Sequence, residues 1–256
     1  MYKLFLTFIT SVLLLGNQQS KPTLFLIGDS TVKNGKDKGD NDQWGWGHFI
    51  GDYFDTAKIT VSNRALGGTS SRSYQTKGLW DSILTRLKPG DYVIMQFGHN
   101  DGGPLDDTAR ARGTIKGTGP ESREIFNPIT KQQEVVHTYG WYLAKVISET
   151  KAKGAIPVVC SPIPRNVWKD GKVARATTDY GLWAKTTAEK EGALFIELNG
   201  LIADIYDKEG EAKVASTYFG TKDHTHTVEA GAKLNAAEVI AGIQSLKGLS
   251  LNKYLK

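Results

Sequence analysis

Four widely separated blocks of the sequence contain residues that together could hydrolyse an ester. They contribute Ser30, Gly68, Asn100 and the pair Asp223 and His226. A serine hydroxyl is a weak nucleophile at neutral pH unless a base takes its proton, and a histidine has a suitable unperturbed pKa for that task. These residue types predict acyl transfer, provided that the fold brings them together.

Each of these residues has a predicted role. Ser30 would be the nucleophile, His226 the general base, and Asp223 the group that orients the imidazole and stabilises its charged form. The backbone N–H groups of Ser30 and Gly68 and the side-chain amide of Asn100 would form an oxyanion hole. Such donors bind the negative charge that develops on the ester carbonyl oxygen.

Short apolar strands are the elements expected to position these residues. The first lies within Leu24–Thr31, where an unbroken apolar run ends at Gly28 and presents Ser30 at its exit. Similar runs occupy Lys58–Asn63, Asp91–Phe97, Ala155–Ser161 and Ala193–Leu198. Because strands and helical patterns alternate, the sequence predicts an α/β fold with three α/β/α layers and a five-stranded parallel sheet. In the flavodoxin-like order 2-1-3-4-5, the exits of the first three strands become neighbours.

The segments between these strands show helical patterns and one long polar stretch. We predict helices at His48–Phe54, Leu79–Leu87, Val135–Lys153, Tyr180–Glu191, a run through Tyr206, and Val228–Leu246. The stretch from Gly102 to about Gln133 lacks a clear period and is expected to be a loop. Among its basic residues are Arg110 and Arg112. We hypothesise that this loop flanks the cleft and that its arginines bind the carboxylates of uronate sugars.

The four polar blocks resemble the ordered motifs of the SGNH, or GDSL, hydrolases. That family's pattern Gly-Asp-Ser, Gly, Gly-x-Asn-Asp and Asp-x-x-His is matched by Gly28-Asp29-Ser30, Gly68, Gly98-His99-Asn100-Asp101 and Asp223-His224-Thr225-His226. The resemblance extends from Leu24 to the C-terminal helix. It implies the SGNH-hydrolase fold and ester hydrolysis without a metal or another cofactor.

The same pattern decides between neighbouring candidates. The Asp-x-x-His spacing favours His226 over His224 as the base. The family glycine usually lies two residues before a threonine or serine, here Ser70, which favours Gly68 over Gly67.

Within that family, the sequence most resembles the rhamnogalacturonan acetylesterases. The resemblance rests on Gly28–Thr31, Gln43–Gly47, Arg72–Tyr74 and Phe97–Asp101. It implies a serine carbohydrate esterase that removes O-acetyl groups from an acetylated acidic polysaccharide. Large aromatic side chains are usually buried, so the tryptophans could instead complete the core, and His224 could be a solvated neighbour. With those alternatives open, the candidate substrate contacts are Trp44, Trp46, Tyr74, His99, Arg110, Arg112 and His224.

Length and composition limit the class of protein. The chain has 256 residues, 39% hydrophobic and 23% charged, with a formal net charge of +5, as is typical of a soluble globular protein. No Lys/Arg-rich run accompanies this charge, so we expect no nucleic-acid partner. The single cysteine, Cys160, excludes an internal disulfide and every multi-cysteine metal site. We expect a monomer.

The N-terminal residues differ in composition from the remainder. Lys3 precedes the apolar stretch Leu4–Leu15, which leads into polar residues. This pattern is typical of a secretory signal peptide, and the stretch is too short to span a membrane comfortably. We therefore expect residues 1–20 to be a signal peptide and residues 21–256 a single catalytic domain. The location would be secreted or periplasmic, without membrane association.

Three alternatives remain open at this point. The loop Asp223–His226 and the distant His99 could supply zinc ligands. A non-catalytic carbohydrate-binding protein could use Trp44, Trp46 and Tyr74 as platforms. A related esterase could act on acetylated xylan, on a lipid or on a thioester, although a lipase would be expected to have an apolar lid and the long loop is polar.

Overall fold

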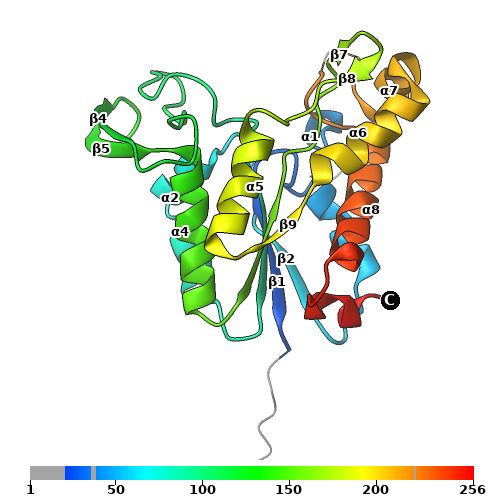
Figure 1. The fold of residues 1–256 in the computed structure, drawn as a ribbon, viewed down its shortest axis with the longest axis horizontal. Helices are drawn as coiled ribbons and strands as arrows, with labels where there is room; N and C mark the ends of the chain where they lie inside the picture. Colours follow the sequence, from blue (N-terminus) through cyan, green and yellow to red (C-terminus); the bar gives the residue numbers. More distant parts are fainter. Residues whose placement is uncertain (1–20, 36–38, 222) are drawn as a thin grey trace, which may run out of the picture.

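The centre of the molecule is a five-stranded parallel sheet (Figure 1). The computed structural model describes residues 21–35, 39–221 and 223–256. The strands follow the order β2-β1-β3-β6-β9, so the predicted order 2-1-3-4-5 is confirmed. Their bounds are β1 Thr23–Gly28, β2 Thr60–Asn63, β3 Tyr92–Gln96, β6 Ile156–Cys160 and β9 Leu194–Ile196.

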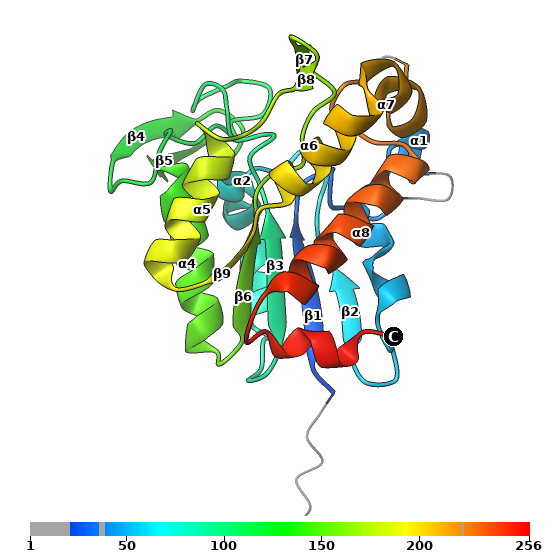
Figure 2. The same cartoon turned by 45° about the vertical axis from the view of Figure 1, so that its right-hand side comes forward.

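Strand β1 is apolar throughout because both of its faces are covered. Its alternate residues Leu24 and Leu26 belong to one buried cluster, whereas Phe25 and Ile27 belong to another. Each cluster lies between the sheet and one layer of helices (Figure 2). A strand buried on both faces loses the polar alternation of a half-exposed strand, which explains the unbroken run in the sequence.

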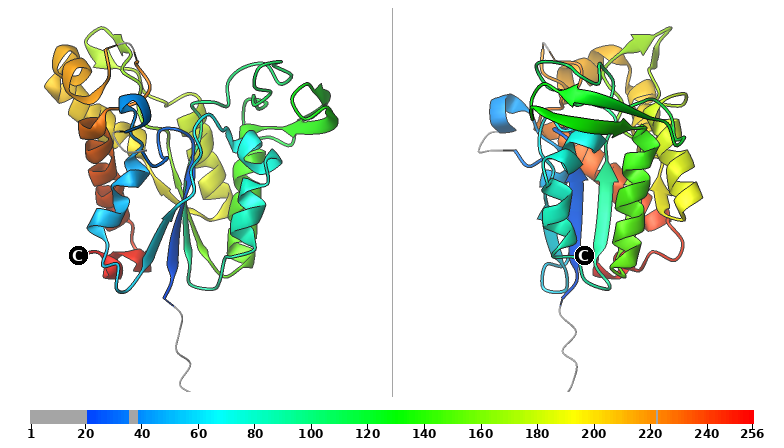
Figure 3. Two further views of the ribbon diagram at one scale, coloured as in Figure 1. Left: turned by 180° about the vertical axis from the view of Figure 1, so that it is seen from behind. Right: turned by 90° about the vertical axis from the view of Figure 1, so that its left-hand side faces the viewer.

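Two helical layers enclose the sheet, so the predicted three-layer architecture is confirmed (Figure 3). One layer contains α2 Ser71–Thr76, α3 Leu79–Leu84, α4 Tyr139–Ala152 and α5 Tyr180–Glu191. The other contains α6 Leu198–Glu209, α7 Glu211–Tyr218, α8 Glu229–Ser245 and the short 3-10 helices η1 Trp46–His48, η2 Ile50–Tyr53 and η3 Ser250–Tyr254. Within the described residues, no helix is long and apolar enough to cross a membrane.

The predicted long loop was only partly correct. Strand β4, Ser122–Asn127, pairs antiparallel with β5, Gln132–His137, to form a hairpin. The helix predicted from Val135 therefore begins only at Tyr139, where the Thr138 side chain accepts a hydrogen bond from the backbone N–H of Trp141 and caps α4. Val136 faces the interior as a strand residue rather than as the first turn of a helix.

Smaller differences concern short elements. The helix predicted at His48–Phe54 is replaced by η1 and η2, and the helix predicted at Leu79–Leu87 ends at Leu84. The sequence pattern did not predict α7, the short helix α1 at Gly39–Asp42, or the two-stranded ribbon of β7 Trp168–Lys169 and β8 Lys172–Val173. The predicted signal peptide, residues 1–20, lies outside the described residues.

Both accessory hairpins lie at one edge of the sheet. In Figure 1, β4–β5 and β7–β8 stand at the top, on opposite sides of the edge where the strands end. Open parallel sheets bind their ligands at this carboxyl edge. The exits of β1, β2 and β3 are adjacent there because the strands themselves are adjacent.

Candidate active site

Ser30, His226 and Asp223 form a continuous hydrogen-bonded line. Ser30 Oγ lies 2.8 Å from His226 Nε2, and His226 Nδ1 lies 2.6 Å from Asp223 Oδ2. A carboxylate only accepts hydrogen bonds, so Nδ1 carries the proton and Nε2 is free to accept the serine proton. The arrangement can move a proton from the hydroxyl to the imidazole.

Asp223 is held in its ionised form. Partial burial raises its pKa, but hydrogen bonds from the backbone N–H groups of His226 and Thr225 and from the His226 ring outweigh burial and leave the pKa below its usual value. An ionised carboxylate at this position favours the protonated imidazole that forms when His226 accepts a proton.

A tight turn directly after β1 presents Ser30. The Asp29 carboxylate accepts hydrogen bonds from the backbone N–H and the hydroxyl of Thr31, and the Asp29 carbonyl accepts from the backbone N–H of Val32. Gly28 is required at the strand exit because an added Cβ would lie 2.6 Å from the Gln96 carbonyl oxygen. The local sequence thus turns the chain immediately after the strand and leaves the serine side chain at its end.

The glycine loop after β2 lies beside the serine. A Cβ added at Gly67 would lie 3.6 Å from Ser30 Cβ, and Gly68 adopts a left-handed φ of +78° that favours glycine. Asn100 Nδ2 donates a hydrogen bond to Thr69 O at 2.9 Å, which anchors the amide against this loop. An amide carries two N–H donors, so the second stays available for an oxyanion.

A buried carboxylate ties the segment of Asn100 to helix α2. Asp101 accepts hydrogen bonds from the backbone N–H and hydroxyl of Ser71 and from the backbone N–H of Gly98. Complete burial raises the pKa of Asp101 to about 7, although these donors oppose the shift. Its role is to hold the Gly98 turn against the start of α2, which follows the glycine loop.

Two residues that the sequence analysis missed brace the line of polar residues. Gln43 Nε2 donates to Asp223 Oδ2 at 3.1 Å. Arg165 donates to the Thr225 hydroxyl and, at 3.0 Å, to the backbone carbonyl of His99. Gln43 belongs to the segment Gln43–Gly47 that carries the family resemblance, but no local pattern predicts the contacts of either residue, because each meets its partners only after the chain has folded.

Two of the predicted substrate contacts are wrong, because their rings lie in the core. Trp46 is fully buried and donates its indole N–H to Gln96 Oε1. Tyr74 is 1% exposed and donates its hydroxyl to the carbonyl of Arg64. Aromatic side chains bury large apolar areas, and these two rings bury theirs against the protein core rather than against a sugar.

Trp44 has a different position from Trp46. It is half-buried, packs against His48 and Phe49, and lines a hollow together with Gln43 and Asp223. It remains a candidate substrate contact at the outer side of the site.

The predicted histidine contacts differ in exposure. His99 has a side chain that is only 4% exposed, and its Nε2 donates to the carbonyl of Ile163 while Nδ1 faces Asp29 Oδ2 at 3.7 Å. Burial lowers the pKa of His99, although Asp29 opposes that shift. His224 is exposed beside His226. Within the described part of the chain, no group of three or more His, Cys, Asp or Glu side chains is placed to hold a metal ion.

Of the two arginines predicted to contact substrate, Arg112 lies beside the glycine loop and Arg110 lies near Arg112. Arg112 donates to the carbonyl of Gly68 at 2.8 Å, and Arg110 is exposed. Burial and the charge of Arg110 both lower the pKa of Arg112. A bound anion at this position would offset both effects.

Comparison with known proteins identifies the family. The sequence profile described as GDSL-like Lipase/Acylhydrolase matches residues 26–234. The chain belongs to the GDSL-like lipase/acylhydrolase family. The predicted resemblance and the prediction of an ester hydrolase are therefore confirmed.

Two curated relatives of this GDSL-family chain are full-length matches. It is 31% identical to a rhamnogalacturonan acetylesterase of Emericella nidulans, covering 96% of this chain and 94% of the relative. It is 32% identical to YesY of Bacillus subtilis, described as a probable rhamnogalacturonan acetylesterase, covering 90% of this chain and 95% of the relative. These relatives support the prediction of a carbohydrate acetylesterase.

Solved structures show the same fold. The crystal structure of YxiM from Bacillus subtilis aligns with a TM-score of 0.71 and 26% identity, covering 90% of this chain but 58% of that one. Axe2, an acetylxylan esterase from Geobacillus stearothermophilus, aligns with a TM-score of 0.58 and 17% identity, covering 86% of this chain and 93% of that one. At 17% identity, the likeness to Axe2 concerns the fold alone.

Proposed function

We propose that this GDSL-family protein is an exported serine esterase that removes O-acetyl groups from rhamnogalacturonan. The observation that carries the proposal is the hydrogen-bonded line from Ser30 through His226 to Asp223, with distances of 2.8 and 2.6 Å. It is supported by two full-length relatives described as a rhamnogalacturonan acetylesterase and a probable one.

In the first half of the reaction, Ser30 takes the acetyl group from the sugar. Its Oγ attacks the acetyl carbonyl carbon while its proton passes to His226 Nε2. The resulting oxyanion accepts hydrogen bonds from the backbone N–H groups of Ser30 and Gly68 and from the Asn100 amide. The bond to the sugar oxygen then breaks, and that oxygen takes the proton from His226, which leaves an acetyl ester on Ser30.

In the second half, water releases acetate. His226 accepts a proton from a water molecule as the water oxygen attacks the acetyl carbon, and the same donors bind the new oxyanion. The bond to Ser30 Oγ breaks, and Oγ takes the proton back from His226. Asp223 stays ionised throughout and stabilises the imidazolium in both halves.

The positive charge beside Gly68 supports an acidic polymer as substrate. Arg112 and Arg110 are two cations close enough to interact: the pKa of Arg112 is lowered by burial and, to a smaller extent, by the charge of Arg110. A uronate carboxylate near them would gain a favourable interaction in a partly buried site. A neutral polymer such as xylan offers no group of this kind.

The test is acetate release from acetylated rhamnogalacturonan and from acetylated xylan, each with and without EDTA, for the wild type and Ser30→Ala. The expected result is release mainly from the pectic polymer, unaffected by EDTA and abolished in the variant. Release mainly from xylan would refute the substrate and keep the mechanism. Unchanged release by Ser30→Ala would refute the mechanism.

A further inference from the structure

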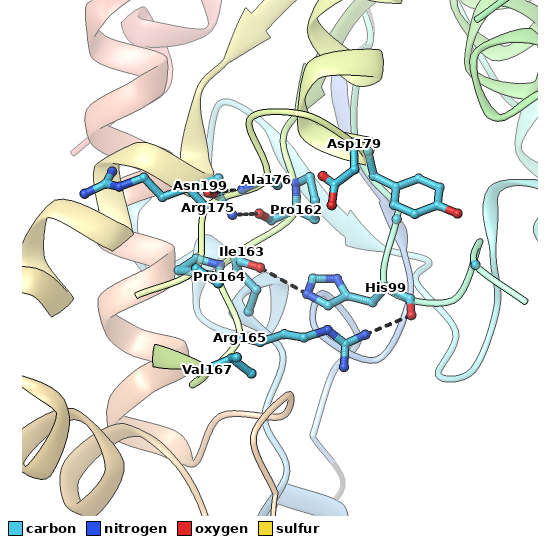
Figure 4. A pocket seen from close by; sticks show the side chains of 14 residues that line it. His99, Pro162, Ile163, Pro164, Arg165, Val167, Arg175, Ala176, Asp179 and Asn199 are labelled. Atoms are coloured by element: carbon cyan, nitrogen blue, oxygen red, sulfur yellow. Dashed lines mark hydrogen bonds between the residues drawn. The ribbon is translucent and has the colours of Figure 1, made fainter. Parts of the chain in front are cut away.

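A cavity of about 460 Å³ adjoins the proposed active site (Figure 4). It lies between the chain that leaves β6, the start of α5 and the segment that carries the oxyanion amide. His99, one residue before Asn100, lines it, and so does Arg165, which binds Thr225 in the loop of His226. The volume falls within the roughly 300–1,000 Å³ of ligand pockets.

Most polar side chains around this cavity already have partners. Arg175 pairs with Asp204 at 2.8 Å and with Asp207 at 2.7 Å. Asn199 accepts a hydrogen bond from the backbone N–H of Ala176 and donates another to the carbonyl of Pro162. The terminal nitrogens of Arg165 donate to His99 O and to the Thr225 hydroxyl.

Among the lining side chains, the buried Tyr180 hydroxyl and His99 Nδ1 have no hydrogen bond with the described residues. Asp179 is the charged lining side chain that has no partner in that part of the chain. Its carboxylate is exposed and has neither a hydrogen bond nor an ion pair with the described residues. Asp179 is the N-cap residue of α5, where an aspartate ordinarily accepts a hydrogen bond from the first turn, yet it makes no such bond. Figure 4 shows its carboxylate turned toward the side of the cavity where Pro162 lies.

The remaining wall is apolar. Pro162, Ile163 and Pro164 follow β6 and line the cavity on the side toward which the Asp179 carboxylate is turned (Figure 4). An apolar wall facing a hydrogen-bond acceptor suits a sugar ring, which has an apolar face and hydroxyl donors. Next to Asp179, a uronate would instead bring a second carboxylate close, and like charges in a partly enclosed site repel. Arg165, the cation of the lining that has no ion pair with the described residues, directs its terminal nitrogens to His99 O and the Thr225 hydroxyl, on the side of the catalytic loop.

We propose that this cavity binds a neutral sugar unit adjacent to the acetylated unit, with Asp179 accepting hydrogen bonds from its hydroxyls. The inference rests on the proposed action on a polysaccharide, and it adds the direction in which the polysaccharide chain lies across the site. In the order β2-β1-β3-β6-β9, the exits of β2 and β6 lie on opposite sides of β1. An acidic acetylated unit would therefore have its carboxylate toward Arg112 beside Gly68, and its neutral neighbour would lie toward Asp179.

The experiment compares Asp179→Ala with the wild type on three acetylated oligosaccharides. Their units are alternating acidic and neutral sugars (rhamnogalacturonan), neutral sugars only (xylan), and uronates only (homogalacturonan). Each kcat/KM is divided by that on p-nitrophenyl acetate, which is too small to reach the cavity. The matched control is Asp52→Asn, an exposed aspartate near the C-terminus whose side chain has no partner among the described residues.

For Asp179→Ala, the ratio on substrates with neutral sugars should fall roughly tenfold through a higher KM, as expected for a lost hydrogen bond to a charged group. The ratio on the uronate oligosaccharide should stay the same or rise. Ala174→Trp, which fills the cavity from another wall, should lower the neutral-sugar ratio without altering Asp179. Unchanged ratios in both variants, or equal losses on all three substrates, would overturn the inference.

These outcomes separate the inference from the proposed function. A wild type active on xylan but not on rhamnogalacturonan would refute the proposed substrate, and the effect of Asp179→Ala on xylan would still decide the inference. A wild type active on rhamnogalacturonan with no effect of either variant would refute only the inference. A wild type that cleaves p-nitrophenyl acetate alone would refute both.

Discussion

Asn100 shows how a single side chain can be fixed and still be free to act. One amide hydrogen donates to Thr69 O at 2.9 Å, which sets the plane of the amide against the glycine loop. The other hydrogen remains for the oxyanion. A donor that is already oriented before the charge develops costs no reorganisation during the reaction, which is why such donors contribute strongly.

Asn100→Ala is expected to lower kcat on p-nitrophenyl acetate by about 10²–10³-fold, the usual loss for one oxyanion donor, with little change in KM. Asn100→Asp keeps the shape but removes both donors, so it should lose at least as much activity at neutral pH. Thermal unfolding of both variants serves as the control for folding. A folded Asn100→Ala variant with more than half of the wild-type kcat would contradict the assigned role.

At this scale, the sequence predicted the site residues that lie in a turn just after a strand. It did not predict the site residues whose contacts come from distant parts of the chain. Ser30 and Asn100 lie two and four residues after the ends of β1 and β3, so an apolar run ending in turn formers reveals them. Gln43 and Arg165 touch the loop of His226 only through the tertiary fold. Tyr74 was misplaced because an aromatic residue near a motif looks the same in sequence whether it faces solvent or core.

At the scale of elements, the hairpin β4–β5 is tethered to the body by one buried cation. Arg72 in α2 is fully buried and donates to both carboxylate oxygens of Glu134 in β5, at 2.7 Å each. It also donates to the carbonyls of Leu105 and Gly113, which bracket the segment of Arg110 and Arg112. One guanidinium therefore organises both the hairpin and the loop that bears the positive charge.

Glu134→Ala should destabilise the protein by roughly 3–5 kcal/mol, because it leaves the buried Arg72 charge without its partner. Chemical unfolding at neutral pH measures this. Glu124→Ala is the matched control, since Glu124 lies on the same hairpin, is exposed, and has no partner among the described residues. Equal stability of the two variants would contradict the tether.

The same pair sets a pH dependence. Burial raises the pKa of Glu134, but hydrogen bonds from Arg72 and Asn127 outweigh it and leave the pKa below 4.5. A lowered folded pKa means that the stabilisation is present above the unfolded pKa and is lost as pH falls through the folded value. The difference in stability between Glu134→Ala and the wild type should therefore shrink below about pH 4.

Whether an element could be predicted from the sequence depended on how many of its side chains are buried. Strand β1 and helix α5 are long enough and regular enough in their apolar pattern to be located from sequence. The hairpin β4–β5 buries little more than Ile125 and Val136, so it has no clear period of two. Val136 also falls at helical spacing with Tyr139 and Leu143, which led to the overlong helix, and only the Thr138 cap decides where α4 begins.

At the scale of the whole molecule, the sheet order converts local turns into one site. A crossover between two parallel strands carries the chain from the carboxyl edge of the sheet back to its amino edge. Every strand therefore ends at the carboxyl edge. The order β2-β1-β3-β6-β9 places the serine turn between the glycine loop and the oxyanion segment. This order followed from the alternation of strands and helices together with the motif positions, but the side chains that line the cavity near Asp179 could not be placed without coordinates.

The charge of the whole molecule gives the last prediction. The formal net charge is +5, and Arg110 is exposed at the carboxyl edge without a partner among the described residues. Exposed charges attract a polyanion over a distance that shrinks from about 30 Å at 0.01 M salt to about 3 Å at 1 M. The kcat/KM on acetylated rhamnogalacturonan should therefore fall several-fold, roughly five to tenfold, between those salt concentrations.

Arg110→Gln should flatten this salt dependence. Arg86→Gln removes the same charge from the opposite edge of the sheet, before β3, and should leave the dependence nearly unchanged. Hydrolysis of p-nitrophenyl acetate, which has no charge to attract, should vary little with salt in all three proteins. If Arg86→Gln flattened the dependence as much as Arg110→Gln, the attraction would arise from the net charge rather than from the arginines beside the site.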